Sequence, residues 1–497
     1  MKPGSKARRI GIWSTAALAT AATLTGLTVL SVNDSKPSQD DQAHAAVPPP
    51  PPPSQRPNIV VITTDDQDVA SLSVMPNVRR LLAEQGTTYA NSFSSTPLCA
   101  PSRASFLTGQ YAHNHGITDN SEATGGGYEG LRKTETLPVW LTRAGYSTAH
   151  IGKFLNGYGA HRRTEIPPGW SDWYGLVGPS TYTMFGYTIN ENGRLRTYGD
   201  MHTPQRGLYQ TDVLASKAVD YITRRPHADR PFFLSINTLA PHPELPAVSG
   251  QGRWTAPRPA PRHQTALPDA RLPRTPAFNE ADVSDKPRHI QRLAPQNPLQ
   301  LDHDHRRRLQ SLLAVDDMVA RIVESLRSTG QLDNTLIFFT SDNGMMEGDH
   351  RINFKEHPYE QSIRVPLIVR GPGVQRGRTE QRFVTTVDLT ATVLAAARAK
   401  PGIAIDGRSF LGTAAPRSRD MLLETGPRVG TTPWYTAIRT ERYLYVEHST
   451  GERELYDLLT DPYQVQSRHA DPALRKVRED LARRLHLLRS CAGQSCP

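Results

Sequence analysis

Cysteine is scarce in this chain of 497 residues, which contains only three, at Cys99, Cys491 and Cys496. The last two lie close together near the C-terminus, and in an exported protein we expect them to form one disulfide. Two free thiols in a frayed, exposed tail are the alternative. In either case Cys99 is left without a partner, and a leftover cysteine in an exported chain requires an explanation.

Other features are missing as well. No basic run is interleaved with aromatic residues, so the net charge of +10 does not point to nucleic acid as a partner. Such a surface suits anionic lipid or glycans, and simple solubility is the plain alternative. There are no internal repeats, and no segment beyond the first 45 residues is apolar enough to span a bilayer, so we expect no stable membrane partner.

The N-terminus has the features of a signal peptide in their usual order. Basic residues precede an apolar run from Ile10 to Val32, and Ala43-His44-Ala45 offers a small-x-small cleavage site. We therefore predict a signal peptide over residues 1–45, with secretion to the extracellular space, and the Arg8-Arg9 pair permits twin-arginine export. Because the cleavage site lies far from the apolar run, an uncleaved membrane anchor is the alternative. Residues 46–55 are a proline-rich linker.

Apolar runs rich in β-branched residues alternate with helical patterns between residues 56 and 402. This alternation predicts an α/β catalytic domain with a mixed, mostly parallel sheet flanked by helices. The predicted strands are Asn58–Thr63, Phe232–Ile236, Leu336–Phe339 and Pro366–Val369. The predicted helices are Met75–Gln85, Leu137–Ala144, Thr211–Thr223 and His305–Ser328.

Two regions depart from this alternation of strands and helices. Residues 241–298 are rich in Pro, Arg and His and predict an irregular insertion, which we interpret as a lid facing the substrate, with disorder as the alternative. Residues 403–497 predict a smaller α+β subdomain. Its expected antiparallel strands and terminal helix are Trp434–Arg439, Tyr443–His448, Glu454–Asp457 and Pro472–Arg489.

One motif surrounds the unpaired cysteine: Cys99-Ala100-Pro101-Ser102-Arg103, continued by Leu107-Thr108-Gly109. Proline favours the first turn of a helix, so Cys99 is expected at a helix N-terminus, where free amides favour an anion. Arg103 is one turn further on and can reach back to the same place. A buried structural cysteine before a helix is the alternative.

Acidic residues follow two of the predicted strands. Asp65 and Asp66 end the first, and Asp342 with Asn343 ends another in the same way. The carboxyl ends of strands in open α/β sheets are where ligands bind, and adjacent carboxylates repel unless a cation joins them. An oxygen-rich set of this kind predicts a hard cation, Ca²⁺ or Mg²⁺, although each pair alone could be a solvated turn.

The motif around Cys99 resembles the signature of the type I sulfatases, and the resemblance extends from about Arg56 to Leu488. In that family a formylglycine-generating enzyme reads C-x-P-x-R and oxidises the cysteine to formylglycine (3-oxoalanine). The resemblance implies an alkaline-phosphatase-like fold and a sulfuric ester hydrolase. It also implies that the hydrated formylglycine supplies the oxygen that attacks sulfur.

Residue roles follow from the same resemblance. It implies one calcium ion held by Asp65, Asp66, Asp342, Asn343 and the modified Cys99. Lys153 in the Gly-Lys motif, Lys355 and Arg103 are expected to bind the sulfate. His242, in Ala-Pro-His-Pro, is expected to protonate the leaving oxygen, and His350 is a further candidate contact.

The sequence departs from many sulfatases at Leu155, where a histidine usually helps to release the sulfate. Residues 152–158 instead resemble the branch of N-acetylglucosamine-6-sulfatases and heparan 6-O-sulfatases, which implies a 6-O-sulfated amino sugar or related glycan as substrate. His113 or His115 is a candidate for the missing base. The alternatives are a phosphodiesterase or phosphonate monoester hydrolase of the same superfamily, and a non-catalytic binder of sulfated glycans.

Overall fold

The structure is a computed structural model that describes residues 56–200, 207–224, 230–245, 254–412, 419–426 and 434–496. These residues all belong to one compact unit. The predicted signal peptide (1–45) and proline-rich linker (46–55) lie outside the described residues. Within the described part of the chain, no helix combines the length and hydropathy needed to cross a membrane.

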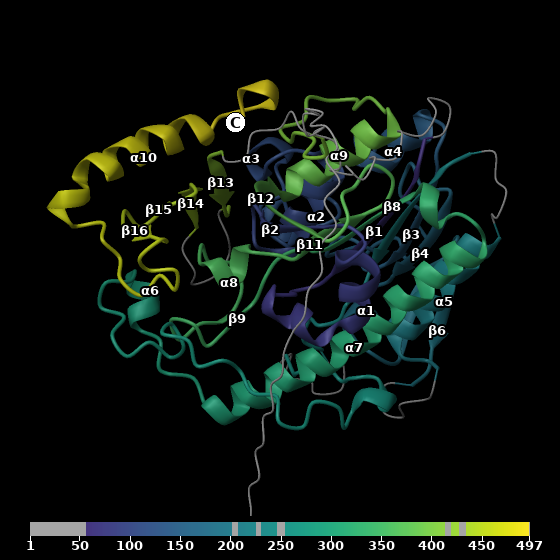
Figure 1. The fold of residues 1–497 in the computed structure, drawn as a ribbon, viewed down its shortest axis with the longest axis horizontal. Coiled ribbons are helices and arrows are strands. Elements are labelled where there is room, and N and C mark those ends of the chain that lie inside the picture. Colours follow the sequence, from purple (N-terminus) through teal and green to yellow (C-terminus); the bar gives the residue numbers. More distant parts are fainter. Residues whose placement is uncertain are drawn as a thin grey trace, which may run out of the picture. The chain divides into compact units, whose positions relative to one another are not determined.

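A ten-stranded sheet forms the centre of this unit (Figure 1). Five neighbouring strands, β8, β1, β7, β3 and β4, pair in parallel, which confirms the predicted mostly parallel sheet. In spatial order the strands are β12 (Arg378–Thr385), β2 (Thr87–Phe93), β11 (Leu367–Arg370), β8 (Thr335–Ser341), β1 (Asn58–Thr64), β7 (Phe232–Asn237), β3 (Ser147–Gly152), β4 (Asp172–Leu176), β5 (Tyr187–Glu191) and β6 (Arg194–Tyr198).

Strand β11 differs from its parallel neighbours in direction. It runs antiparallel to both β8 and β2. A parallel return needs a long crossover, usually a helix, to carry the chain back to the starting edge of the sheet. Between β8 and β11 the described chain has only a short ribbon, β9 (Met346–Glu347) and β10 (Asn353–Phe354), and the four-residue helix α8 (Glu360–Ile363). The chain therefore re-enters the sheet from the edge at which β8 ended.

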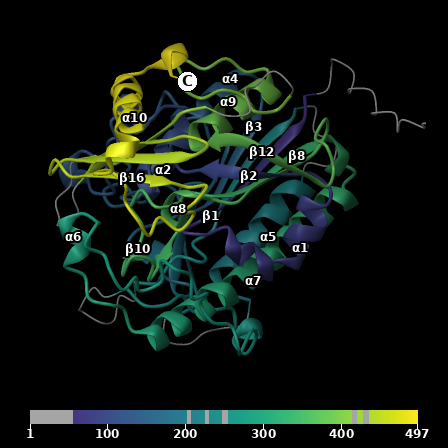
Figure 2. The same ribbon diagram turned by 60° about the vertical axis from the view of Figure 1, so that its left-hand side comes forward.

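Helices cover both faces of the sheet (Figures 1 and 2). On β1, Val60 and Ile62 pack into a core with α5 (Gln210–Thr223) and α7 (Pro298–Ser328). The alternate residues Ile59 and Val61 pack into a second core on the other face. That core includes residues of α2 (Cys99–Thr108), α4 (Leu137–Arg143) and α9 (Thr386–Ala397). Burial on both faces explains why β1 is apolar at all four positions from Ile59 to Ile62.

Two predicted helices differ from the observed ones. The segment predicted as Met75–Gln85 forms only the short α1 (Pro76–Val78), followed by a π-helical turn at Arg79–Ala83. Helix α7 starts at Pro298, well before the expected His305. The side chain of Asn297 accepts hydrogen bonds from the amides of Leu299 and Gln300 and so caps the earlier start, with proline in the first turn.

The second half of the chain adds a four-stranded antiparallel sheet and a terminal helix (Figure 2). Leu481 and Leu485 of the helix pack on Leu422 and Ile438 of the sheet. Between 254 and 297, the described insertion is mostly irregular. The insertion contains the short helix α6 (Arg288–Gln291), and the terminal helix is α10 (Arg475–Leu488). The antiparallel sheet consists of β13 (Met421–Glu424), β14 (Tyr435–Arg439), β15 (Tyr443–His448) and β16 (Arg453–Asp457).

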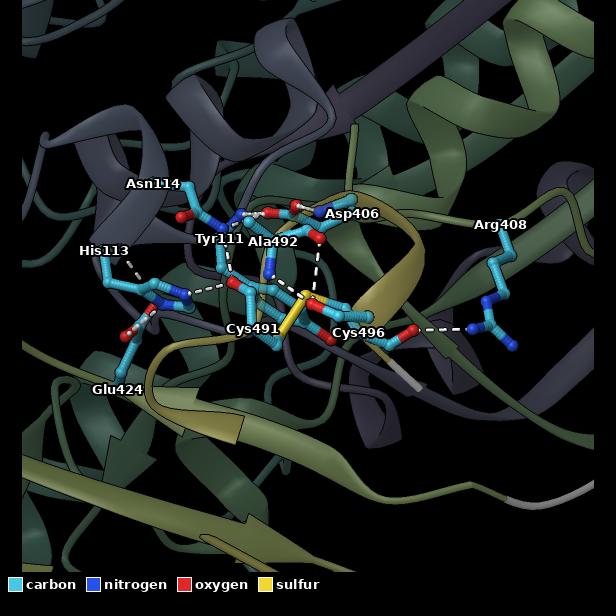
Figure 3. Close-up of a disulfide and its surroundings, with 11 residues drawn as sticks. Tyr111, His113, Asn114, Asp406, Arg408, Glu424, Cys491, Ala492 and Cys496 are labelled. Atoms are coloured by element: carbon cyan, nitrogen blue, oxygen red, sulfur yellow. Dashed lines mark hydrogen bonds and ion pairs between the residues drawn. A yellow bond between two sulfur atoms is a disulfide. The ribbon is translucent and has the colours of Figure 1, made fainter. Parts of the chain in front are cut away.

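The two cysteines of the C-terminal tail are buried against the body of the protein, whereas Ala492, Gln494 and Ser495 between them are exposed (Figure 3 shows their surroundings). Cys491 and Cys496 form a disulfide, as predicted. The amide of Gly493 donates to Asp406 at 2.7 Å, and Arg408 donates to the carbonyl of Cys496 at 2.6 Å. These bonds, made by a loop that follows α9, hold the tail against the body of the protein.

Candidate active site

The carboxyl ends of four parallel strands meet at one edge of the sheet, the position where open α/β sheets bind ligands. Each of these strands is followed by polar residues that the sequence predicts for the site, and all are buried. They are Asp342 and Asn343 after β8, Asp65 and Asp66 after β1, His242 after β7, and Lys153 after β3.

Cys99 is the first residue of α2, as predicted. The amide of the next residue, Ala100, donates to the side-chain oxygen of Asn120 at 2.8 Å. The Cys99 Sγ lies 3.7 Å from Oδ1 of Asp65, and Nζ of Lys355 donates to the same sulfur at 2.9 Å. The cysteine therefore lies between an acid and a base in the buried cluster, and the predicted Lys355, which directly follows β10, contacts it.

Each acid of the cluster has a basic partner. Lys153 forms an ion pair with Asp65, and Lys355 forms one with Asp66. Arg103 Nε donates to Asp342 at 2.8 Å, and its Nη1 donates to the carbonyl of Lys153 at 3.0 Å. The three cations predicted to bind a sulfate are therefore brought together around the carboxylates.

These charges shift the pKa values of the cluster. Burial alone would raise the pKa of the Asp65 carboxyl, but Lys153 and the neighbouring cations outweigh it and hold the pKa below its ordinary value. Burial, reinforced by the negative charge of Asp65, raises the pKa of Asp342 to about 6. Burial also raises the pKa of the Cys99 thiol to about 12, against the opposing pull of the lysines. The unmodified thiol is therefore protonated at neutral pH.

The acidic residues fit a divalent cation. Asp66 Oδ2 and Asn343 Oδ1 are buried and have no hydrogen-bond partner among the described residues, which leaves two acceptors free for a metal. Ligand atoms of Asp65, Asp66, Cys99 and His242 lie within 4.8 Å of one another. An oxygen-rich set of this kind suits a hard cation such as Ca²⁺. The oxygens of Asp342 already accept from the Asp66 amide, at 3.2 Å, and from Arg103.

His242 faces the cluster with its Nε2, which lies 3.6 Å from Oδ2 of Asp66. Its Nδ1 lies 2.7 Å from the carbonyl of Pro243, so Nδ1 carries a proton and donates there. Burial lowers the pKa of His242 to about 4, although Asp66 and Asp65 oppose this. The negative charge of a bound ester would oppose it further.

The three other candidate histidines, His350, His115 and His113, make their hydrogen bonds to residues other than Cys99. His350 is buried, pairs with Glu280 and packs on the ring of Tyr359, 4.3 Å away. His115 Nε2 lies 3.0 Å from the hydroxyl of Ser105, and its Nδ1 accepts from the backbone. Burial lowers the pKa of His115 to about 3, so the ring is neutral.

His113 is the third of them and contacts the C-terminal tail (Figure 3). Its Nδ1 lies 3.0 Å from Glu424 and its Nε2 2.8 Å from the carbonyl of Cys491. In the described structure no hydrogen bond joins any of the three histidines to Cys99, so none stands next to it as a base.

Sequence reasoning missed a residue that supports the site from outside. Arg308 of α7 donates to the backbone carbonyl of Asp66 at 2.8 Å and pairs with Glu347 at 3.1 Å. Asp66 has a φ of 66°, in the left-handed region that residues other than glycine adopt infrequently, and the hydrogen bond from Arg308 stabilises this conformation. An arginine in a long amphipathic helix is normally solvated, and no local signal distinguishes Arg308.

Comparison with known proteins decides the family. Residues 57–399 match the sulfatase family, and residues 348–491 match the C-terminal region of N-sulphoglucosamine sulphohydrolase. The chain belongs to the sulfatase family. This sulfatase is therefore a sulfuric ester hydrolase, and the polar cluster at the strand ends is its candidate active site.

The relatives of this sulfatase agree with the branch that its sequence resembles. It is 32% identical to the N-acetylglucosamine-6-sulfatase of Homo sapiens, an alignment that covers 87% of this chain and 84% of the relative. It is 33% identical to an arylsulfatase of Volvox carteri, over 87% of this chain and 74% of the relative.

Solved structures confirm the fold. One neighbour, described as a complex with its substrate D-glucosamine-2-N,6-O-disulfate, has a TM-score of 0.70 and 23% identity, covering 87% of this chain and 97% of its own. A phosphonate monoester hydrolase of Agrobacterium radiobacter has a TM-score of 0.64 and 24% identity, covering 88% and 96%. At these identities the likeness concerns the fold alone.

Proposed function

We propose that this sulfatase is secreted and hydrolyses 6-O-sulfate esters of N-acetylglucosamine or a related sulfated glycan. The N-acetylglucosamine-6-sulfatases among its relatives match along most of their length. Relatives from Caenorhabditis elegans and Drosophila melanogaster carry the description of extracellular sulfatases. The net charge of +10 suits a polyanionic substrate.

Formylglycine made from Cys99 by a formylglycine-generating enzyme is the proposed nucleophile. When hydrated, this group supplies an oxygen nucleophile that is regenerated as the sulfate leaves. The observation that carries the proposal is the place of Cys99, in a C-x-P-S-R motif at the start of α2 and within 2.9 Å of Lys355. The raised pKa of the unmodified thiol makes it a poor nucleophile, which favours a modified residue.

The other residues of the cluster have roles that follow from their charge. Lys153, Lys355 and Arg103 hold the sulfate oxygens and offset the charge that develops in the transition state. His242 Nε2 faces the cluster. Once the negative charge of the bound ester has raised the pKa of His242 and Nε2 is protonated, that nitrogen delivers its proton to the departing sugar oxygen, because an alkoxide is a poor leaving group. Asp65, Asp66, Asp342 and Asn343 would hold a calcium ion, which supplies positive charge beside the sulfate.

The mass of the tryptic peptide Leu81–Arg103 tests the nucleophile. Protein from a host that contains the modifying enzyme is expected to give a peptide with an aldehyde in place of the Cys99 thiol. A Cys99→Ala variant made in the same host should release no sulfate. An unmodified cysteine in that host would overturn the proposed chemistry and favour a sulfated-glycan binder.

The preference for sulfate over phosphorus esters needs a separate measurement. The phosphonate monoester hydrolase among the structural neighbours shows that the same fold supports that reaction. Rates on an aryl sulfate and on an aryl phosphodiester, measured with one enzyme preparation, should favour the sulfate. A larger rate on the phosphodiester would assign the site to the other reaction.

A further inference from the structure

Two aromatic side chains that the sequence does not single out lie beside the proton donor. The ring of Tyr182 lies 5.2 Å from the ring of His242, and the ring of Trp254 lies 5.0 Å from it. The two aromatic rings also contact each other at 5.2 Å. The Nζ of Lys153 lies 4.8 Å from the centre of the Tyr182 ring. Tyr182 therefore contacts both a sulfate-binding cation and the proton donor.

These two rings differ from the catalytic cluster in exposure. Lys153 and His242 are only 1% and 3% exposed, whereas Tyr182 and Trp254 are partly exposed. Both rings therefore offer apolar surface next to the buried reaction centre. Partly exposed aromatic side chains in a polar site are typical of ligand contacts, because their faces bind apolar groups in a fixed orientation.

The position of the leaving group determines which part of the substrate contacts the rings of Tyr182 and Trp254. A proton can pass from His242 only if the ester oxygen lies within hydrogen-bond distance of its Nε2. The rest of the alcohol must then lie against the neighbours of His242. The axial hydrogens of a pyranose ring form an apolar face that suits an aromatic ring, whereas a short acyclic alcohol cannot cover it.

A polar side chain, that of Asn156, lies beside Tyr182. Asn156 donates through Nδ2 to the hydroxyl of Tyr182 at 2.7 Å, which holds the tyrosine ring. Its Oδ1 is buried and has no hydrogen-bond partner among the described residues. A buried acceptor without a partner is costly, so a donor from a ligand would stabilise it. A sugar hydroxyl or amide N–H provides such a donor.

We propose that Trp254 and Tyr182, whose rings meet edge to face at an angle of 80°, form an aromatic platform for the pyranose ring that carries the sulfate. The sugar face stacks on the ring of Trp254 and its edge packs against Tyr182, with Asn156 as a polar contact at its side. The platform selects cyclic sugar sulfates over short acyclic alkyl sulfates. This proposal rests on the proposed function, since it takes His242 as the proton donor to a sugar oxygen.

Steady-state kinetics of Trp254→Ala and Trp254→Phe test the platform on two substrates, N-acetylglucosamine 6-sulfate and ethyl sulfate. Loss of one stacked ring is expected to raise KM for the sugar sulfate about tenfold. The kcat/KM for ethyl sulfate is expected to stay within about twofold, and phenylalanine should retain most of the sugar affinity. Trp434→Ala is the matched control, because Trp434 is 43% exposed and contacts none of these residues in the described structure.

Two kinetic outcomes would overturn the proposal. An equal loss on both substrates would show that Trp254 only holds His242 in place. An unchanged KM for the sugar sulfate would show that the ring does not contact the sugar.

A binding measurement separates the platform from the proposed chemistry. Calorimetric titration of the inert Cys99→Ser protein with N-acetylglucosamine 6-sulfate should give about tenfold weaker binding when Trp254→Ala is added. Equal affinity of the two proteins, or no binding to Cys99→Ser, overturns the platform. A wild-type enzyme that releases no sulfate, beside a Cys99→Ser protein that binds through Trp254, would refute the proposed reaction and leave the platform standing.

Discussion

At the scale of single residues, the site is a balance of buried charges. Asp66 and Asp65 are fully buried. The negative charge of Asp66 is compensated by Lys355, and that of Asp65 by Lys153. Breaking a buried pair by removing one partner costs about 3–5 kcal/mol, because the other charge is left uncompensated. A cation bound to the same carboxylates would offset part of that cost.

The variant Lys355→Met measures this balance. Its melting temperature without metal should fall clearly below that of the wild type, since removal of one partner from a buried pair costs about 3–5 kcal/mol. Added Ca²⁺ should raise the melting temperature of the variant more than that of the wild type, because the ion replaces the lost positive charge. Thermal unfolding in chelator and in calcium measures both effects.

Lys400→Met is the matched control for this experiment, because Lys400 is exposed. Its melting temperature should match the wild type in both conditions. If Lys355→Met were as stable as the wild type in chelator, Asp66 would not depend on this lysine.

At the scale of elements, the end of β3 positions Lys153. Gly152 has a φ of 109°, and a Cβ built on it would lie 1.9 Å from the carbonyl oxygen of Asn237 on β7. The next amide, of Lys153, donates to that same carbonyl at 2.9 Å. Only glycine allows the two strands to approach so closely at the point where the chain turns into the site.

The substitution Gly152→Ala should therefore disturb the site more than an ordinary glycine substitution. We expect a loss of kcat of tenfold or more, on the order of what a shift of about 1 Å in a catalytic group costs, together with reduced stability. Gly193→Ala is the control, since Gly193 also has a positive φ of 88° but has open space around it. Equal effects of the two substitutions on kcat would show that the strain, and not the contact with β7, matters.

At the scale of the whole molecule, the C-terminal tail is joined to the catalytic part through His113. Both ring nitrogens of His113 face acceptors, the carboxylate of Glu424 and the carbonyl of Cys491. Only the doubly protonated ring can donate to both. Burial opposes the charge, but the hydrogen bond to Glu424 outweighs it and raises the pKa of His113 above its ordinary value of 6.5.

Because folding raises the pKa of His113, protonation of this histidine stabilises the folded state at pH values below its ordinary pKa. This contribution is fully present below pH 6.5 and is lost as the pH rises through the raised value. The stability difference between wild type and His113→Gln should therefore shrink with rising pH across that range. Chemical unfolding at a series of pH values measures it, with a substitution of the exposed His486, His486→Gln, as the control. A constant difference would mean that His113 is neutral in the folded state.

Much of the fold could be predicted because its signals are local. Strand β1 is apolar at each of Ile59, Val60, Val61 and Ile62, and this pattern arises only when both faces of a strand are covered. The direction of β11 could not be predicted in the same way. An apolar run has the same composition in either direction, and only the path of the chain between strands determines which way it runs.

The residues of the candidate site also fall into two groups: those that local sequence motifs predict and those that only the tertiary structure places. Asp65, Asp66, Asp342 and Cys99 stand in short motifs at strand and helix ends, so the sequence by itself determined that they converge and that the chain is a sulfatase. Only the tertiary structure decided that Arg308 would anchor Asp66 and that Tyr182 and Trp254 would lie against His242. It also decided that His113 and His115 would make their hydrogen bonds elsewhere. These contacts join segments that are far apart in the chain, and no local pattern records a contact that depends on how distant helices and loops pack together.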